Sequence, residues 1–412
     1  MQTAHKIELV PNDKQKIYFK KACGVSRFAW NWGLAEWNRR WKEEGSLSTG
    51  MGLKKEFNAI KKEKFPWVYE VTKYAAQQPF IELDKAWKRF FKGVGGKPKF
   101  KKKGKCKDSF YIGGDQIKAK GKRVKIPNLG WVKMRENVRF FGKIHSVAVS
   151  RTADRWFASF QVDVQASGVP CKNQAGTGID LGSRKMAVLS GGGIAIAAPK
   201  PLKKALKRLK RMNRSLSRKR HPRKKGDTTP ISNNFRKQQA KIAKLHARIA
   251  NIRKEALHQV TTWITDRYKI IGIENLNVKG MLSNRRISRE MADVGLYEFR
   301  RLLEYKAKRK GCEIVVFDRF FPSSKTCCKC GFLNEKLGSG EIFECPACGS
   351  RMDRDLNAAV NLDPTENPIP EVLRELTPVE IAALQRKAGL SVATSIVEAG
   401  IERQCLSMDR FA

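Results

Sequence analysis

Two closely spaced pairs of cysteines are the feature that most constrains how this 412-residue chain can fold. Each pair has the form Cys-x-x-Cys, fourteen residues separate the pairs, and their members are Cys327, Cys330, Cys345 and Cys348. Four cysteines at this spacing are typical of a zinc ribbon, in which two tight turns bring four thiolates around one structural metal ion. A redox-active pair is the alternative, but it would be a single Cys-x-x-Cys in a different fold. We therefore expect residues 325–350 to hold one zinc ion, with the thiol of Cys328 pointing away from it.

Net charge is the second constraint. The chain carries 84 Lys and Arg against 39 Asp and Glu, a formal net charge of +45. Such an excess repels itself unless a polyanion neutralises it, and nucleic acid is the polyanion that fits best. A membrane surface is the alternative, but the polar start "MQTAHKIELVPNDKQ" and the lack of a long apolar run argue against it. The sequence therefore predicts a cytoplasmic protein that binds nucleic acid and no membrane.

The positive charge is concentrated in two stretches. One is "GVGGKPKFKKKGKCK", and the other spans residues 200–254, which hold 21 Lys or Arg and a single acidic residue, Asp227. Short charge runs are commonly solvated surface, but the length and single sign of the second run favour a nucleic-acid contact. Apolar residues three or four apart after Ile242 predict an amphipathic helix there. The candidate contacts are Lys99, Lys101, Lys102, Lys103, Lys203, Lys204, Lys207, Arg208 and Arg211.

The first part of the chain reads as one strand, a group of helices and then many short strands. The strand covers 6–10, and helices are expected within 13–45, over roughly 52–62, and over roughly 71–92. Pro79 lies inside the last helix, which should bend or restart there. Period-two alternation from 109 to 165 predicts a small β-barrel or sandwich.

The second part alternates strands and helices. We expect a three-strand meander over 174–198, a strand at 269–275, a helix at about 291–310 and a strand at 313–318. This order is typical of an α/β fold with a mixed sheet.

Three carboxylates stand at the ends of elements in this α/β part. Asp180 lies in "GIDLG", Glu274 ends the apolar run "IIGIE", and Asp355 lies near the start of a helix in "MDRDLNAAVNL". One such residue is most often a turn, cap or solvent-facing group. Three together favour divalent cations, because Mg²⁺ prefers oxygen ligands and two ions can clamp a phosphodiester. Asp353 competes with Asp355 for this role and is equally suited to be the N-cap of the helix.

These motifs together resemble the TnpB-type (OrfB) proteins of insertion sequences. The resemblance is carried by "GIDLG", "GIENL", "FFPSSKTCCKCG", the second knuckle "CPAC" and "DRDLNAAVN", and it extends to "LVPNDKQ", "GKPKFKKK" and "IPNLGWVKM". It weakens after Asp363. Members of that family are transposon-encoded RNA-guided DNA endonucleases related to the type V CRISPR effectors.

The resemblance implies an α+β multidomain fold. Its parts are a wedge-like β-barrel domain (1–10 and 105–173), a helical recognition domain (11–104), an RNase H-like (RuvC) α/β nuclease domain (174–324 and 351–365), the inserted zinc ribbon (325–350) and a variable, loosely ordered tail (366–412).

The resemblance also implies a site and partners. Asp180, Glu274 and Asp355 would be the catalytic ligands of divalent metal, two Mg²⁺ or Mn²⁺ ions. Lys73 and Gln77 would contribute to reading a short motif beside the target. The implied partners are a guide RNA from the transposon end and a double-stranded DNA target. The sequence leaves the oligomeric state open; we favour a monomeric ribonucleoprotein, associated with the prokaryotic nucleoid.

Three other classes fit less well. A nuclease-inactive RNA-guided repressor would have lost carboxylates, yet Asp180, Glu274 and Asp355 are all present. A transposase of the RNase H superfamily would use three carboxylates but not this zinc ribbon. A zinc-ribbon RNA-binding protein needs no carboxylate triad.

Overall fold

The computed structural model describes residues 2–140, 142–164, 175–224, 226–338, 340–365 and 374–387. The chain divides into two compact units, Met1–Ala166 and Ser167–Ala412. None of the described helices is long and apolar enough to cross a membrane.

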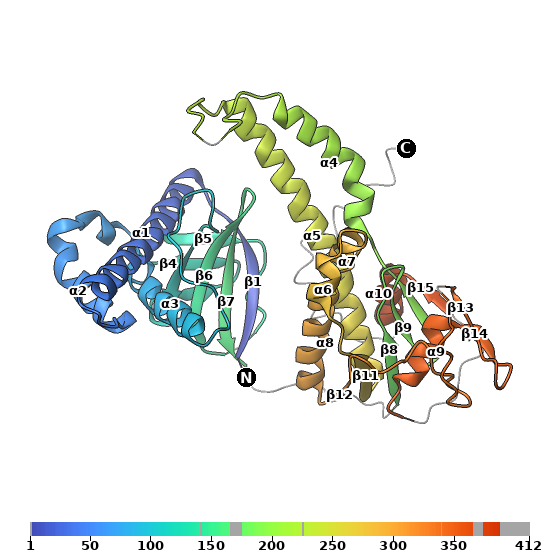
Figure 1. Ribbon diagram of the computed structural model, residues 1–412. Coiled ribbons are helices and arrows are strands. Elements are labelled where there is room, and N and C mark those ends of the chain that lie inside the picture. The colour runs from blue at the N-terminus through green and yellow to red at the C-terminus, as the bar shows by residue number, and fades with distance from the viewer. Residues whose placement is uncertain are drawn as a thin grey trace. The chain divides into compact units, whose positions relative to one another are not determined.

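Three helices of the described residues lie beside the strands of the first unit (Figure 1). The core of this unit includes many aromatic side chains, among them Phe19, Trp30 and Phe80. The helices are α1 (Asp13–Glu43), α2 (Gly50–Lys64) and α3 (Lys73–Phe91), with short 3₁₀ turns at Pro66–Glu70 and Gly114–Gln116. Asn12 starts α1 with a capping box, because its side chain accepts from the Gln15 backbone while the Gln15 side chain accepts from the Asn12 backbone. α3 does not restart at Pro79, contrary to one of the two expectations, since this buried residue lies inside one continuous helix.

The strands of the first unit form one seven-stranded sheet in the order β2-β6-β7-β1-β5-β4-β3. The strands are β1 (Gln2–Val10), β2 (Ser109–Gly113), β3 (Lys118–Lys120), β4 (Arg123–Ile126), β5 (Gly130–Met134), β6 (Ile144–Thr152) and β7 (Arg155–Asp163). The short strands expected over 109–165 therefore join β1 in one hydrogen-bonded sheet in the described residues. β1, from the start of the chain, pairs with β7 over Gln2–Leu9 and so ties both ends of the unit together.

A six-stranded mixed sheet organises the second unit. Its order is β12-β11-β8-β9-β10-β15, formed by β8 (Gly176–Asp180), β9 (Lys185–Leu189), β10 (Ile194–Ala197), β11 (Ile270–Glu274), β12 (Glu313–Phe317) and β15 (Arg374–Leu376). β8, β11 and β12 run parallel, whereas β9 is antiparallel to β8 and β10. The carboxyl ends of β8 and β11 therefore lie side by side at one edge of the sheet.

Helices pack on this sheet and bury its apolar side chains. They are α5 (Asn233–Arg267), α6 (Val278–Ser283), α7 (Ser288–Val294) and α8 (Leu296–Lys310). The expected single helix at about 291–310 is instead two. Gly295 separates α7 from α8 at a φ of 80°, a left-handed conformation that ends α7 because glycine alone adopts it without strain.

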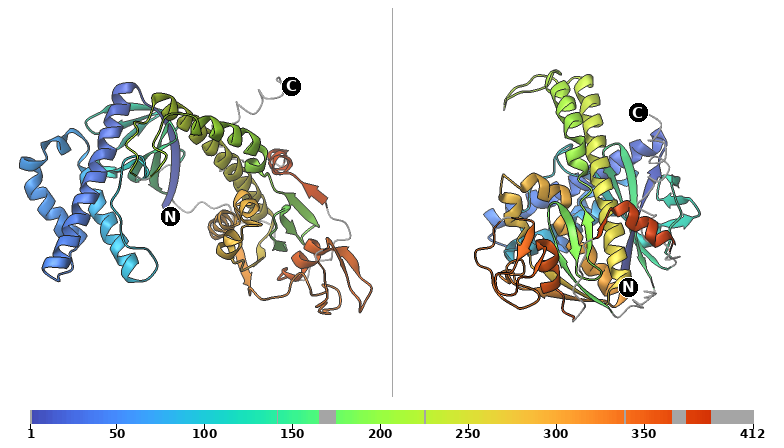
Figure 2. Two further views of the ribbon diagram at one scale, coloured as in Figure 1. Left: turned by 45° about the horizontal axis from the view of Figure 1, so that its top comes forward. Right: turned by 90° about the vertical axis from the view of Figure 1, so that its right-hand side faces the viewer.

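α4 (Pro201–Ser217) and the first half of α5 form an antiparallel pair that extends away from the sheet (Figures 1 and 2). An apolar seam holds the pair together, formed by Leu209, Ile242, Leu245 and Ile249. The buried carboxylate of Asp293 on α7 accepts hydrogen bonds from the backbone N–H groups of Leu202 and Lys203. It thus caps α4 from another helix, since Lys200 at the N-cap position makes no side-chain cap bond.

The remaining elements lie near the carboxyl-terminal part of the chain. β13 (Ile342–Glu344) pairs with β14 (Arg351–Asp353), and α9 (Arg354–Asn361) follows β14 directly. β15 pairs with β10, and α10 (Pro378–Lys387) packs on α5. The expectation of a loosely ordered tail over 366–412 is therefore wrong for 374–387, where Leu376 and Ile381 join the core because their apolar side chains cover the sheet and α5. The remainder of that tail lies outside the described residues.

Candidate active site and cysteine cluster

Neighbouring strand ends place two of the candidate carboxylates together. Ile179 pairs with Ile273 across β8 and β11, and the next residue of each strand is Asp180 or Glu274. Both strands contain a central glycine. A Cβ on Gly178 would lie 2.0 Å from the carbonyl oxygen of Ala359, so this glycine allows α9 to pack directly on the strand.

The N-terminus of α9 brings in the third carboxylate. Asp353 is the N-cap, as its position predicts, and its Oδ1 accepts hydrogen bonds from the backbone N–H groups of Asp355 (3.0 Å) and Leu356 (3.1 Å). Leu356 and Ala359 then bury their side chains against the sheet. The N-cap hydrogen bonds and this packing together fix the first turn of α9, which contains Asp355.

The three carboxylates share one electrostatic environment. Burial, together with the negative charges of Asp355 and Glu274, raises the pKa of Asp180 from 3.8 to about 7, while Arg354 opposes this rise. Burial also raises the pKa of Glu274. Desolvated carboxylates that repel one another are stabilised by a cation, so this edge of the sheet fits oxygen-ligated divalent metal.

The carboxylates are nevertheless not gathered at ligand spacing. Among the described residues, the only group of three or more His, Cys, Asp or Glu side chains that could hold a metal ion is the cysteine cluster, whose ligand atoms all lie within 4.8 Å of one another. The structure therefore brings Asp180, Glu274 and Asp355 close enough to interact electrostatically, but it does not close them around a single point.

A lysine that the sequence interpretation missed also reaches this site. Lys185, the first residue of β9, places its Nζ 2.6 Å from Oδ2 of Asp353 and 3.6 Å from Oδ2 of Asp355. No local signal marks Lys185, because its partners are far away in the sequence. The positive charge of Lys185 therefore offsets part of the negative charge of the carboxylates.

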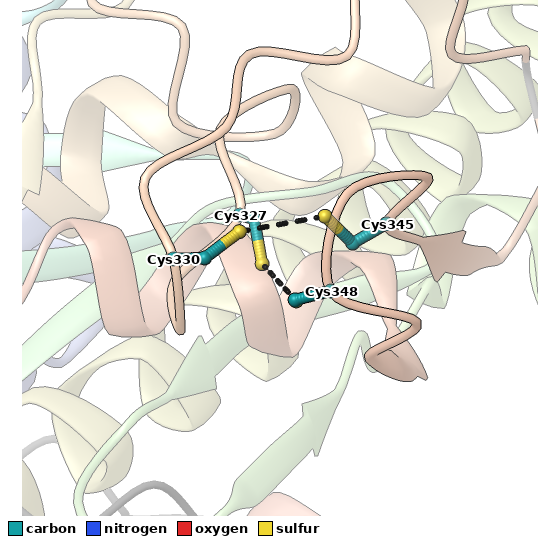
Figure 3. Close-up of side chains that lie close together, drawn as sticks. All are labelled: Cys327, Cys330, Cys345 and Cys348. Carbon is teal, nitrogen blue, oxygen red and sulfur yellow. Dashed lines mark hydrogen bonds between the residues drawn. The ribbon is translucent and has the colours of Figure 1, made fainter.

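The four cysteines face one another (Figure 3). The Sγ atoms of Cys327 and Cys348 are 3.7 Å apart, and those of Cys330 and Cys345 are 3.6 Å apart. Tetrahedral zinc with Zn–S bonds of about 2.3 Å requires sulfur–sulfur distances of about 3.8 Å, whereas a disulfide requires about 2.05 Å. The cluster is therefore compatible with a zinc site.

Glycines complete both knuckles of the cluster. Gly331 and Gly349 have φ values of 74° and 69°, and their N–H groups donate to the carbonyls of Cys327 and Cys345. Left-handed backbone at these positions favours glycine and turns the chain back toward the thiols. Cys328 lies outside the cluster, with its Sγ 3.4 Å from the sulfur of Met352.

Two asparagines join the cysteine loop to α9. The side chain of Asn357 accepts from the Cys328 N–H (3.0 Å) and donates to the Thr326 carbonyl (2.7 Å). Asn361 donates to the carbonyls of Ser323 (2.8 Å) and Thr326 (2.7 Å). The helix that carries Asp355 is thus hydrogen-bonded to the loop that carries the first cysteine pair.

The candidate nucleic-acid contacts of the second unit all lie on α4. The exposed ones form a basic surface on the helix, opposite its apolar seam, and are Lys203, Lys204, Lys207, Arg208 and Arg211. α4 has no acidic residue at all. Its exposed face is therefore free to meet phosphate groups.

The candidate nucleic-acid contacts of the first unit differ in their exposure and in their partners. Lys99, Lys102 and Lys103 are exposed. Lys101 instead places its Nζ 3.6 Å from the centroid of the Trp30 ring, and burial lowers its pKa. Lys73 is exposed but pairs with Asp115 at 3.2 Å, and Gln77 is partly buried on the same helix, α3.

Comparisons with known proteins identify the class. Family models match residues 159–285 ("Probable transposase", OrfB of IS605), 297–362 ("Cas12f1-like, TNB domain") and 1–46 ("Helix-turn-helix domain"). "Putative RNA-guided DNA endonuclease InsQ" of Escherichia coli is 30% identical over 87% of this chain and 91% of its own length. "CRISPR-associated endodeoxyribonuclease Cas12f1" of Sulfoacidibacillus thermotolerans is 29% identical over 29% of each chain. The chain belongs to the TnpB-type (OrfB, IS605) family of transposon-encoded RNA-guided DNA endonucleases.

Two solved structures of Cas12 proteins are also similar to this chain. A "Cas12f1-sgRNA-target DNA complex" is 15% identical, covering 89% of this chain and 100% of that one, with a TM-score of 0.34. "CasPhi-2 (Cas12j) bound to crRNA" is 12% identical, covering 88% and 97%, with a TM-score of 0.43.

Proposed function

We propose that this protein cleaves double-stranded DNA under the direction of a guide RNA, at a site formed by Asp180, Glu274 and Asp355. The observation that carries this assignment is the pairing of β8 with β11, which sets Asp180 beside Glu274, with Asp355 near enough to raise the pKa of Asp180. Retention of all three carboxylates favours an active nuclease over a nuclease-inactive repressor.

The three carboxylates would hold two divalent ions, Mg²⁺ or Mn²⁺. When bound, such ions supply an activated water nucleophile and stabilise the charge that develops on the leaving oxygen. The protein's part is to present oxygen donors in a partly buried setting. Burial at the strand ends, which makes the ionised carboxylates costly without a cation, supports this use.

We assign each part of the fold a role. The order β10-β9-β8-β11-β12 supports an RNase H-like (RuvC) nuclease domain over 174–324 and 351–365. Residues 325–350 would be a structural zinc ribbon inserted in it. The seven-stranded sheet would form the wedge-like domain (1–10 and 105–173), and the helices of 11–104 would form the recognition domain, with Lys73 and Gln77 near the motif beside the target.

The guide RNA, transcribed from the transposon end, would lie on basic surfaces that include α4 and residues 97–107. Base pairing would supply sequence specificity, while the protein binds the backbone. We propose that one copy of the chain and its RNA form the active particle, which acts on nucleoid DNA.

Purified ribonucleoprotein provides the direct test. Sequencing the co-purified RNA would identify the guide, and a plasmid that carries the matching sequence should be cut in Mg²⁺. The control is a plasmid library that lacks the match. A ribonucleoprotein that cuts matched and unmatched plasmids equally would contradict RNA guidance.

RNA binding has a separate test on α4. Replacing Lys203, Lys204 and Lys207 by Gln should weaken RNA binding and lower the slope of log affinity against log salt by up to about 0.9 per lost phosphate contact. The matched control replaces Lys14, Lys20 and Lys21 of α1 by Gln, which removes equal charge elsewhere. Equal losses in both variants would show that only net charge matters.

A further inference from the structure

Lys185 is the cation nearest to the proposed ligand Asp355, but it forms its shorter ion pair with Asp353. Its Nζ lies 2.6 Å from Asp353 but 3.6 Å from Asp355, so its short contact is with the residue that is not a proposed ligand. The side chains of Lys185, Asp353 and Asp355 are 21%, 24% and 31% exposed. At this exposure the charges are screened less than on open surface, so the choice of partner matters.

The two carboxylate oxygens of Asp353 have different hydrogen-bond partners. Oδ1 accepts the N–H groups of Asp355 and Leu356 and caps α9, while Oδ2 accepts from Lys185. The cap needs only an acceptor, which an asparagine supplies as well as an aspartate. The ion pair needs the negative charge. One substitution can therefore separate the two functions.

We propose that Asp353 is a positioning residue that holds Lys185 away from Asp355 and so keeps Asp355 available to a divalent cation. A partly buried ammonium group needs an anionic acceptor. If Asp353 loses its charge, the nearest remaining carboxylate is Asp355, and Lys185 then competes with metal for it. The inference rests on the proposed function, because it assumes that Asp355 is a metal ligand.

The test measures Mn²⁺ binding to the guide-loaded protein by electron paramagnetic resonance, so that its readout is independent of DNA cleavage. Asp353→Asn should weaken Mn²⁺ binding about tenfold, the lower end of the effect of residues that orient metal ligands. The double variant Asp353→Asn/Lys185→Met should bind Mn²⁺ with the wild-type affinity. Lys185→Met alone should bind Mn²⁺ at least as tightly as the wild type.

Arg184→Met is the matched control. Arg184 is the adjacent basic residue, but it is 77% exposed and pairs with Glu341 instead of the carboxylate site. Its replacement should leave Mn²⁺ affinity unchanged. The zinc content and melting temperature of every variant verify that the ribbon and α9 remain folded.

Two results would overturn the inference. One is wild-type Mn²⁺ affinity in Asp353→Asn, and the other is a double variant that binds as weakly as Asp353→Asn alone, which would mean that Asp353 acts only through the cap. The proposed function fails separately: if Asp180→Ala retains all of the bound Mn²⁺, the metal does not lie at the carboxylates. In that event the Asp353 pairing has no metal ligand to protect.

Discussion

The cysteine cluster and the carboxylate site lie in one unit, and both fit metal, yet they are built differently. The four thiols come from two short turns, and their sulfur atoms lie within 4.8 Å of one another. The three carboxylates come from β8, β11 and α9, far apart in the sequence, and among the described residues only the cysteines form a group close enough to hold one metal ion. The first cluster is set by local turns, whereas the second is set by the assembly of a sheet and a helix.

The two clusters also differ in the charge of their side chains. Thiols can approach one another while protonated, whereas ionised carboxylates repel, and this repulsion contributes to the raised pKa of Asp180. A closed set of four ligands suits a structural ion, and an open set leaves positions for water and substrate. Under the proposed function, the compact cysteine cluster would hold a structural ion, and the three carboxylates would hold the ions that take part in cleavage.

The largest expected effect is on DNA cleavage, and it distinguishes the carboxylate site from the cysteine cluster. Glu274→Gln keeps the shape of the side chain and removes its charge, so cleavage of guided DNA should fall by about 10²–10³ or more. Affinity for RNA and target DNA, and zinc content, should stay at wild-type values. A plasmid-cleavage time course in Mg²⁺ measures the rate. Wild-type cleavage by this variant would remove Glu274 from the site.

The second expected effect is loss of zinc from the cysteine cluster. Cys330→Ser should lose zinc and unfold residues 325–350, because this short segment buries little besides Phe343, Cys327 and Cys345. Elemental analysis should give about one zinc per wild-type chain and much less in the variant. Cys328→Ser, which changes a thiol outside the cluster, is the control. Full zinc content in Cys330→Ser would contradict the ligand assignment.

The smallest effect concerns the pH dependence of stability. The pKa of Asp180 is raised to about 7 in the folded protein, so its neutral form favours folding and this contribution is lost as pH rises from about 4 to about 7. In buffer without divalent cation, Asp180→Asn should therefore melt at a higher temperature than the wild type at pH 8, with a smaller difference at pH 5.

Mg²⁺ provides the control for that measurement. Added Mg²⁺ should raise the melting temperature of the wild type more than that of Asp180→Asn, since only the wild type has the full ligand set. Differential scanning fluorimetry across pH measures both. A difference between the two proteins that does not vary with pH would mean that Asp180 is not desolvated.

Local patterns in the sequence predict some parts of this molecule well. The knuckle spacing, the buried strands that end at Asp180 and Glu274, and the N-cap at Asp353 each depend on a few consecutive residues. Such features are predictable because the same short segment contains both cause and effect.

The features that the sequence did not predict depend on distant partners. Lys185 acquires its role only when β9 folds beside α9. β15 is three residues long, and only its pairing with β10 makes it a strand. Gly295 is the exception, because a glycine inside a helical pattern is a local signal for a helix end.

The bonds from Asn357 and Asn361 to the cysteine loop have a consequence for biosynthesis. A ribosome makes the chain from its N-terminus, so Asp180 and Glu274 leave it long before Asp355. Asp355 leaves the ribosome only after both cysteine pairs, and the bonds from α9 to the loop between Ser323 and Cys328 can form only then. A nascent or truncated chain therefore carries the basic surfaces and two of the three candidate carboxylates. Under the proposed function, the growing chain could therefore bind nucleic acid before it could cut it.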